Sequence, residues 1–173
     1  AQLAAHQALG LTLVQEARAN GWHEVRSRCQ VGEDPHIADA DGVTVLQIAA
    51  RAGRRRLVEE LLRLGAASSA DRQGRTPLLC AAQAGNSACA AALVQGGADI
   101  NEVNPLSGAT VLHVAAQSGD VHFARWALAQ RDIKPEAADF YGVAPLHKAV
   151  AFGSVPVVQA LLVHPRVAVH AAG

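Results

Sequence analysis

Residues 74–86 read GRTPLLCAAQAGN, and this order of turn-forming, apolar and small residues recurs along the 173-residue chain. The same pattern begins again at Gly42, Gly108 and Gly142, and a weaker copy begins at Gly10. Leading glycines lie at 10, 42, 74, 108 and 142 and trailing glycines at 21, 53, 85, 119 and 153, so both series advance by 32, 32, 34 and 34 residues. Such a period indicates a repeat protein, whose units bury apolar surface by stacking on their neighbours.

Each unit predicts a turn, a short helix, a tight turn and a longer helix. A glycine suited to positive φ ends the first turn, and two residues later Thr12, Thr44, Thr76 or Thr110 can cap a helix through its hydroxyl group. The leucine and paired alanines that follow share one helical face, and the trailing glycine ends the helix. Apolar residues then form one stripe on the second helix. In the second and last units this stripe is Leu57, Val58, Leu61 and Leu62, and Val157, Val158, Leu161 and Leu162.

Composition and charge exclude several classes of protein. Half of the residues are apolar but only 3% are aromatic, which predicts a core of alanine, leucine and valine between closely spaced helices. Lys+Arg and Asp+Glu number 15 each, and this zero net charge argues against nucleic acid as the partner. The sequence contains no apolar run of about 20 residues, so we expect no membrane span.

The cysteine count points to a reducing compartment. Cys29, Cys80 and Cys89 form no CxxC pair, and any disulfide would leave one of them unpaired, so we expect the cytoplasm or the nucleus. By their places in the repeat all three are expected to be buried small hydrophobes rather than reactive thiols. The chain contains no methionine, which suggests a trimmed N-terminus and a piece of a larger protein.

The motifs TPLL-AA--G, TVLHVAA--G, APLHKA---G and GGADIN resemble the ankyrin repeat, and the resemblance runs from Gly10 to about Pro165. It implies an all-α, ankyrin-repeat solenoid of stacked helix-turn-helix units joined by β-hairpin-like loops. The short first helices and the hairpin tips would line its concave side. We expect a single domain over 1–173, with repeats at approximately 8–38, 39–70, 71–103, 104–137 and 138–173.

Some residues depart from the family pattern. Arg18, Arg26 and Gln30 are polar where the first unit should be small or apolar, which suits a terminal capping repeat that faces solvent. Ala144 replaces the capping threonine of the last unit, and Asn104 stands near the place where the turn usually carries aspartate.

The residues provide no catalytic or cofactor-binding motif. No Ser/His/Asp set, phosphate-binding loop or GxGxxG motif is present, so we expect no enzyme activity, no cofactor and no catalytic residues. His113 and His147 hold the same repeat position, and the resemblance implies a structural role in which the imidazole bonds to the backbone of neighbouring turns. Two equivalent histidines without a third ligand make a poor zinc site, so we expect no metal.

The resemblance assigns partner contacts to residues that flank the turn glycine and to residues just before the trailing glycine. The predicted partner-binding residues are Arg51, Arg72, Gln73, Arg75, Gln83, Gln117, Phe140, Tyr141 and Phe152. Further positions of the same kind are Asp41, Val43, Leu106, Ser107 and Val143. Arginines at one end of this set and aromatic residues at the other suggest a protein or peptide partner that is acidic in one part and apolar in another.

These expectations favour a monomeric, non-catalytic protein–protein interaction scaffold. The alternative is a regulatory or substrate-recruiting ankyrin segment of a larger enzyme. Two further alternatives stay open. Phe140, Tyr141 and Phe152 either meet a partner or pack against a neighbouring repeat. The RAGRRR cluster at 51–56 is either a solvated helix end balanced by Glu59 and Glu60 or a docking patch for an acidic segment.

Overall fold

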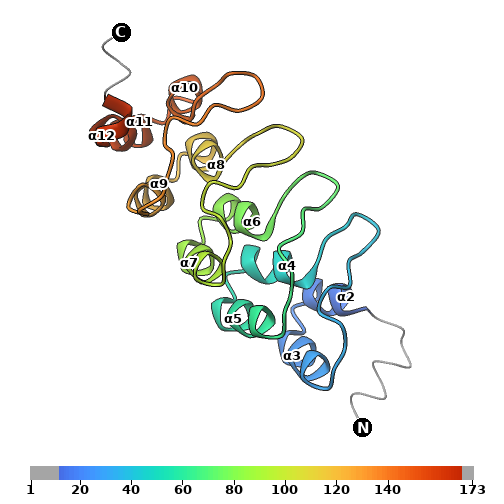
Figure 1. Ribbon diagram of the computed structural model, residues 1–173. Coiled ribbons are helices and arrows are strands. Elements are labelled where there is room, and N and C mark those ends of the chain that lie inside the picture. Colours follow the sequence, from blue (N-terminus) through green and yellow to red (C-terminus); the bar gives the residue numbers. More distant parts are fainter. Residues whose placement is uncertain (1–11, 169–173) are drawn as a thin grey trace.

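The structure, a computed structural model, describes residues 12–168, which form helices joined by turns and loops. The helices come in consecutive pairs, and the two helices of a pair run back beside each other (Figure 1). The pairs are α2 (Leu13–Arg18) with α3 (Trp22–Gln30), α4 (Val45–Arg51) with α5 (Arg55–Arg63), α6 (Pro77–Gln83) with α7 (Ser87–Gln95), α8 (Val111–Ser118) with α9 (Val121–Leu128), and α10 (Pro145–Ala151) with α11 (Val155–Val163). A last helical turn, α12 (Pro165–Ala168), follows α11.

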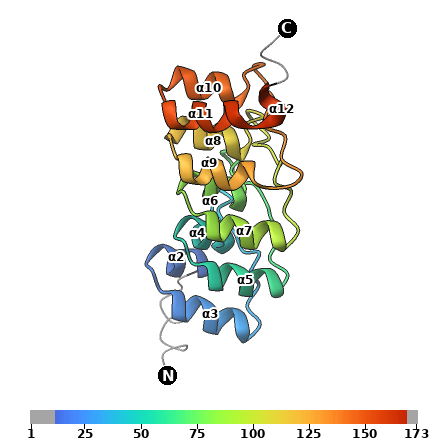
Figure 2. The same cartoon turned by 90° about the vertical axis from the view of Figure 1, so that its left-hand side faces the viewer.

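The pairs stack into two layers. The first helices of the pairs lie side by side in one layer and the second helices in the other (Figure 1, Figure 2). The hairpin loops, which join α3 to α4, α5 to α6, α7 to α8 and α9 to α10, project to one side of the first-helix layer. Over residues 12–168 the extended segments pair only through one isolated antiparallel bridge, between Ala38 and Thr44. The prediction of an all-α solenoid is confirmed.

Helix length also bears on membrane insertion. Between Thr12 and Ala168, every helix is too short or too polar to span a bilayer.

The predicted threonine caps start the first helices. The hydroxyl groups of Thr12, Thr44 and Thr76 accept hydrogen bonds from backbone N–H groups three residues later, at 3.2, 3.4 and 3.2 Å. These bonds satisfy one of the donors that a helix leaves open at its N-terminus. Ala144 has no hydroxyl group, and its own N–H instead donates to Nδ1 of His147 at 3.3 Å.

Glycines end the first helices of the later pairs, as predicted, but not that of the first pair. Gly53, Gly85, Gly119 and Gly153 all have positive φ, between 67° and 73°. In the first pair Asn20 takes this conformation, with a φ of 62°, whereas Gly21 has a φ of −73° and precedes α3. The prediction for Gly21 is therefore wrong. Because α2 ends one residue early, the left-handed position falls on asparagine, which tolerates it better than most residues. The leading glycine at position 10 lies outside the described residues.

The core lies between the two layers and consists mainly of alanine, leucine and valine, as the composition predicts. All three cysteines are buried within it, as expected. Phe123 is the largest fully buried side chain, and its ring centroid lies 5.0 Å from that of the half-buried Trp126. The stripe on α11 is only partly buried. Val157 and Leu161 are buried, but Leu162 is exposed, which corrects the prediction for that position.

The polar residues of the first pair bind to the second pair as well as facing solvent. Nε of Arg26 and Nε2 of Gln30 each donate to the carboxylate of Glu60 on α5, both at 2.6 Å. Arg18, at the end of α2, pairs with Asp39 in the first hairpin loop. The residues that interrupt the apolar pattern therefore join the first described pair to its neighbour.

Candidate interaction surface

A hollow of about 470 Å³ opens between the first helices and the hairpin loops in the middle of the stack. We call it the inner groove. Four residues predicted to bind a partner lie in it: Gln73, Arg75, Gln83 and Gln117. The remaining lining residues come from α6, α8, α10 and the loop before α8, and they are Leu79, Asn104, Ser107, Ala109, Val114, Ser118 and Lys148.

The positive charge of Arg75 is neutralised within the chain. Its Nε atom donates to the buried carboxylate of Asp71 at 2.7 Å, and a second guanidinium nitrogen lies 2.6 Å from the same oxygen. Burial alone would raise the pKa of Asp71, but the bonds from Arg75 and from nearby backbone N–H groups hold the pKa below its ordinary value. Arg75 therefore shapes the hairpin loop and contributes little net charge to the groove.

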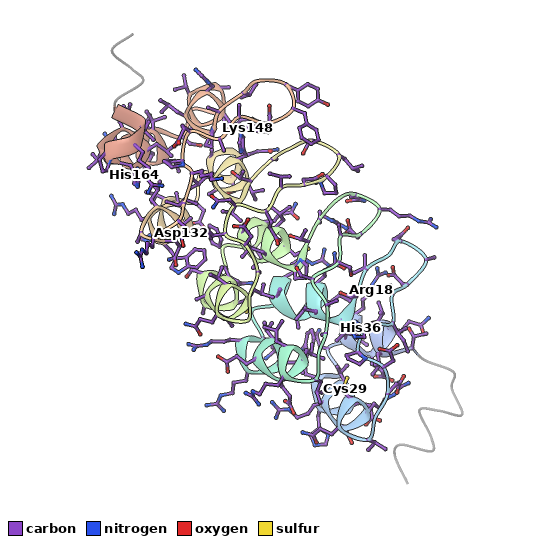
Figure 3. All side chains as sticks on the ribbon, viewed as in Figure 1. Arg18, Cys29, His36, Asp132, Lys148 and His164 are labelled. Atoms are coloured by element: carbon purple, nitrogen blue, oxygen red, sulfur yellow. The ribbon has the colours of Figure 1, made fainter. Side chains whose placement is uncertain are left out.

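Lys148 supplies a positive charge of the inner groove that forms no ion pair, although it interacts at longer range with Asp139, whose pKa it helps to lower. It lies on α10, on the side of the hairpin loops (Figure 3). Among the described residues no carboxylate lies within ion-pair distance of its ammonium group. The exposed side-chain amides of Gln73, Gln83 and Gln117 likewise have no hydrogen-bond partner in the described part of the chain. The groove can thus offer three amide groups and one ammonium group to a ligand.

The other two predicted arginines lie apart from the groove. Arg51 ends α4 and is exposed toward the first helix pair, beside Arg18 and Ala52. Arg72 is exposed on the hairpin loop that precedes α6, where its backbone N–H donates to the carbonyl oxygen of Asp41 at 2.9 Å. The structure therefore does not bring Arg51, Arg72 and Arg75 together into one basic pocket.

The predicted aromatic residues are exposed on the last helix pair. Phe140 and Tyr141, on the hairpin loop before α10, are 65% and 79% exposed, and Phe152, just after α10, is 55% exposed. The backbone N–H of Phe140 donates to the carbonyl oxygen of Ser107 at 2.9 Å, and its ring lies against Gly108. Phe140 and Tyr141 sit at the hairpin end of α10 and Phe152 at the opposite end, so they form two separate apolar spots.

The prediction that Val43 contacts a partner is wrong. Val43 is only 7% exposed and belongs to the hydrophobic core. Both its N–H and its carbonyl group bond to Asp39, which ties the residue to the turn. Val143, the equivalent residue of the last pair, is half-buried.

Lys148 and Asn104 line the groove but were not among the predicted partner-binding residues. Lys148 lies on the groove side of α10, and a cation four residues after the cap position was the signal that could have identified it. Asn104 takes the place of the turn aspartate. Its Oδ1 accepts from the N–H of Leu106 at 2.8 Å, and its Nδ2 donates to the carbonyl oxygen of Gln73 at 2.9 Å.

The structural role predicted for the histidines is confirmed at His113. Its Nδ1 lies 3.1 Å from the N–H of Thr110, and its Nε2 lies 2.8 Å from the carbonyl oxygen of Val143 in the next pair. His147 makes the first type of bond only, and its Nε2 has no partner among the described residues. Residues 12–168 contain no group of three or more side chains that could hold a metal ion.

The thiols are poorly placed for chemistry. Burial raises the pKa of Cys80 to about 11 and also raises the pKa of Cys29 and Cys89, so the reactive thiolate form is disfavoured.

A stack of helix pairs with a polar inner groove and exposed loop tips defines a solenoid repeat protein of the kind that binds other molecules along one side. The family model described as ankyrin repeats (three copies) matches residues 13–104 and again residues 96–171. The chain therefore belongs to the ankyrin repeat family, whose repeats are non-catalytic modules of protein–protein interaction.

Similar curated proteins are much longer than this chain. The E3 ubiquitin-protein ligase KEG of Arabidopsis thaliana is 33% identical over 142 residues, which cover 80% of this chain and 8% of that protein. The nuclear factor NF-kappa-B p105 subunit of Mus musculus is 30% identical over 129 residues, covering 72% of this chain and 13% of that protein. Rabankyrin-5 of Mus musculus is 29% identical over 157 residues, covering 88% and 13% respectively.

Proposed function

We propose that this chain is a monomeric, non-catalytic interaction module that binds a partner peptide or domain through the inner groove and the hairpin tips. The observation that carries the proposal is the set of unpartnered glutamine amides in the inner groove, beside the unpaired ammonium group of Lys148. Amides of this kind can bond to the backbone of an extended segment, which offers both donors and acceptors.

The chemistry of the partner follows from the groups that lack partners of their own. Lys148 in the groove and Arg72 on the loop beside it favour a carboxylate side chain. Phe140 and Tyr141 favour an apolar anchor, because large exposed aromatic residues are frequent hot spots of interfaces. We therefore propose a segment that is acidic at one end and apolar at the other. The stacked helices hold these groups rigidly, which lowers the ordering cost of binding.

The proposal can be tested with displayed peptides. Peptides selected on the wild-type chain are expected to be rich in acidic residues at one end and apolar residues at the other. Their affinity should fall about tenfold or more in a Gln83→Ala/Lys148→Ala variant and in a Phe140→Ala/Tyr141→Ala variant, since truncating a hot-spot residue commonly costs that much. Circular dichroism should show the helical content of each variant to be unchanged.

The matched control lies on the second-helix side. A Gln95→Ala/Arg131→Ala variant changes an amide and a cation on exposed residues that do not line the groove. The control should bind the selected peptides as the wild type does. Unchanged binding by both groove variants, or an equal loss in the control, would contradict the proposal.

The second candidate is a regulatory or substrate-recruiting segment of a larger enzyme. It is supported by the similarity to a ubiquitin-protein ligase of which the chain spans only 8%. In that case the peptides selected above should match a segment of the enzyme's own substrates.

The free, buried cysteines favour a reducing compartment, so we propose the cytoplasm or the nucleus as the location.

A further inference from the structure

A second hollow, of about 540 Å³, lies between the start of α3 and the start of α5. We call it the arginine pocket. It shares no residue with the inner groove, and it lies where the first helix of the second pair turns into the second helix. Its lining residues are Trp22, His23, Arg26, Gly53, Arg54, Arg55, Arg56 and Leu57.

Only part of the positive charge in the arginine pocket is balanced. Nε of Arg55 donates to Glu59 at 2.8 Å, and Nε of Arg26 donates to Glu60 at 2.6 Å. Arg54 and Arg56 have no carboxylate partner among residues 12–168. The pocket therefore has a surplus of two guanidinium charges.

Trp22 forms an aromatic wall that positions one of these charges. The guanidinium carbon of Arg54 lies 5.2 Å from the centre of the Trp22 ring, within the range of a cation–π contact. This contact holds the guanidinium group beside the Trp22 ring in the pocket without neutralising it. A ring face does not act as an ordinary hydrogen-bond acceptor. The N–H groups of the Arg54 guanidinium therefore stay available to a ligand.

The placement of these arginines is unfavourable for the helix itself. Arg54 precedes α5 and provides no side-chain cap; Asn86 before α7 and Ser154 before α11 likewise make no cap bond, whereas Asp120 caps α9. Arg55 and Arg56 follow in the first turn, where the helix dipole favours negative rather than positive groups. A bound anion would relieve both features.

We infer that the arginine pocket binds a phosphate monoester carried on a partner peptide, as in phosphoserine or phosphothreonine. A phosphate group carries a charge of about −1.5 to −2 at pH 7, which matches the two unbalanced guanidinium groups better than one carboxylate does. In addition, one planar guanidinium group can donate two parallel N–H···O bonds to the oxygens of one phosphate group.

The surroundings favour a discrete ligand over a charged surface. Glu59 and Glu60 lie on the same helix as the pocket and neutralise Arg55 and Arg26, so the remaining positive charge is confined to Arg54 and Arg56 and does not extend over the broad surface that a membrane or a nucleic acid would contact. Arg54 and Arg56 both line the pocket, so a single phosphate group bound in it can meet both guanidinium groups. The inference is independent of the inner groove and goes beyond the proposed function.

The test uses Trp22 as the reporter in a Trp126→Phe background, since these are the two tryptophans of the chain. The probe is a short acetylated peptide with one phosphoserine, titrated at an ionic strength of about 0.1 M. We expect saturable quenching or enhancement of Trp22 fluorescence and a rise in the melting temperature with the probe. An Arg54→Gln/Arg56→Gln variant should bind about 10- to 100-fold more weakly, as expected for lost charge-assisted bonds.

The matched control removes the same charge elsewhere on the second-helix side. An Arg63→Gln/Arg125→Gln variant should bind the probe within about twofold of the background protein, which corresponds to a negligible change in binding free energy. Equal weakening in the control would show general charge attraction and overturn the inference.

Further arms separate the possible ligands. The same peptide with aspartate in place of phosphoserine, and vesicles of phosphatidylcholine with phosphatidylserine, should bind much more weakly than the probe. The inference fails if the aspartate peptide binds equally well, if the vesicles bind while the probe does not, or if the probe gives no saturable change.

Discussion

Gln47 and His113 show how one residue position links neighbouring helix pairs. Oε1 of Gln47 accepts from the N–H of Thr44 at 2.7 Å, while its Nε2 donates to the carbonyl oxygen of Arg75 in the next pair. His113 makes the equivalent contacts to Thr110 and Val143 through its two ring nitrogens. The position requires an acceptor near the helix start and a donor farther out, which glutamine and the Nε2–H tautomer of histidine both supply.

This equivalence predicts the effect of substitutions at His113. His113→Gln should change the free energy of unfolding by less than about 1 kcal/mol, because both bonds can form again. His113→Leu, which copies the residue that α6 has at this position, should lower it by about 1–3 kcal/mol, because it leaves a buried N–H and a carbonyl group without partners. Urea unfolding at pH 7.5 measures both values. Equal losses in the two variants would contradict the proposed linking role.

The same residue predicts a pH dependence. Burial lowers the pKa of His113 below its ordinary value of 6.5, although the bond to the Val143 carbonyl acts in the opposite direction. The unfolded chain therefore binds a proton more readily than the folded chain, and stability falls as the pH drops below about 6.5. His113→Gln should reduce the part of this loss that falls between pH 6.5 and pH 5. An unchanged profile would show that other groups cause it.

The hairpin loops stack as elements in their own right. Backbone bonds of 2.9 Å join Arg72 to Asp41 and Phe140 to Ser107, and the Asn104 side chain reaches the carbonyl oxygen of Gln73. The second, third and fourth hairpin loops are therefore each fixed by the loop before them. This regular contact holds Phe140 and the walls of the inner groove in place.

Gly108 and Gly142 provide a matched test of loop stacking. Their φ values are 75° and 74°, so replacing either by alanine carries a similar backbone strain of about 1–2 kcal/mol. A Cβ atom on Gly108 would lie 2.7 Å from the backbone nitrogen of Phe140, whereas nothing lies within 4 Å of one on Gly142. Gly108→Ala should therefore destabilise the chain by about 1–3 kcal/mol more than Gly142→Ala in urea unfolding. Hydrogen exchange at Phe140 should accelerate only in Gly108→Ala.

The sequence predicted the fold more fully than the candidate site. The spacing of threonine and glycine marks both ends of the first helices, because caps and left-handed turns are local features. Asn20 was missed because α2 is one residue shorter than the pattern allows. The inner groove depends on three first helices lying side by side, so Lys148 could not be assigned to it from local pattern alone. The neutralised Arg75 was predictable in principle, since Asp71 precedes it by four residues.

At the scale of the whole molecule, each helix pair is stabilised mainly by packing against the pair on either side of it. Positions that are buried in the middle of the stack are therefore exposed at its last described pair. Ala116 on α8 is 0% exposed, whereas Val150, the equivalent residue of α10, is 63% exposed. Other large apolar side chains are exposed on this last pair, and they are Phe152, Val155, Leu162 and Val163.

This asymmetry predicts opposite outcomes for the same substitution. Ala116→Lys places a charged side chain between α8 and α10, next to the bond that the Ser154 hydroxyl group donates to the Ala116 carbonyl, and should cost about 2–4 kcal/mol of stability. Val150→Lys should change stability by no more than about 0.5 kcal/mol, because its side chain already meets solvent. Urea unfolding together with size-exclusion chromatography measures both, and we expect a monomer in each case. A large loss in Val150→Lys, or a wild type that elutes as a dimer while Val150→Lys does not, would mean that a second copy covers this face in solution.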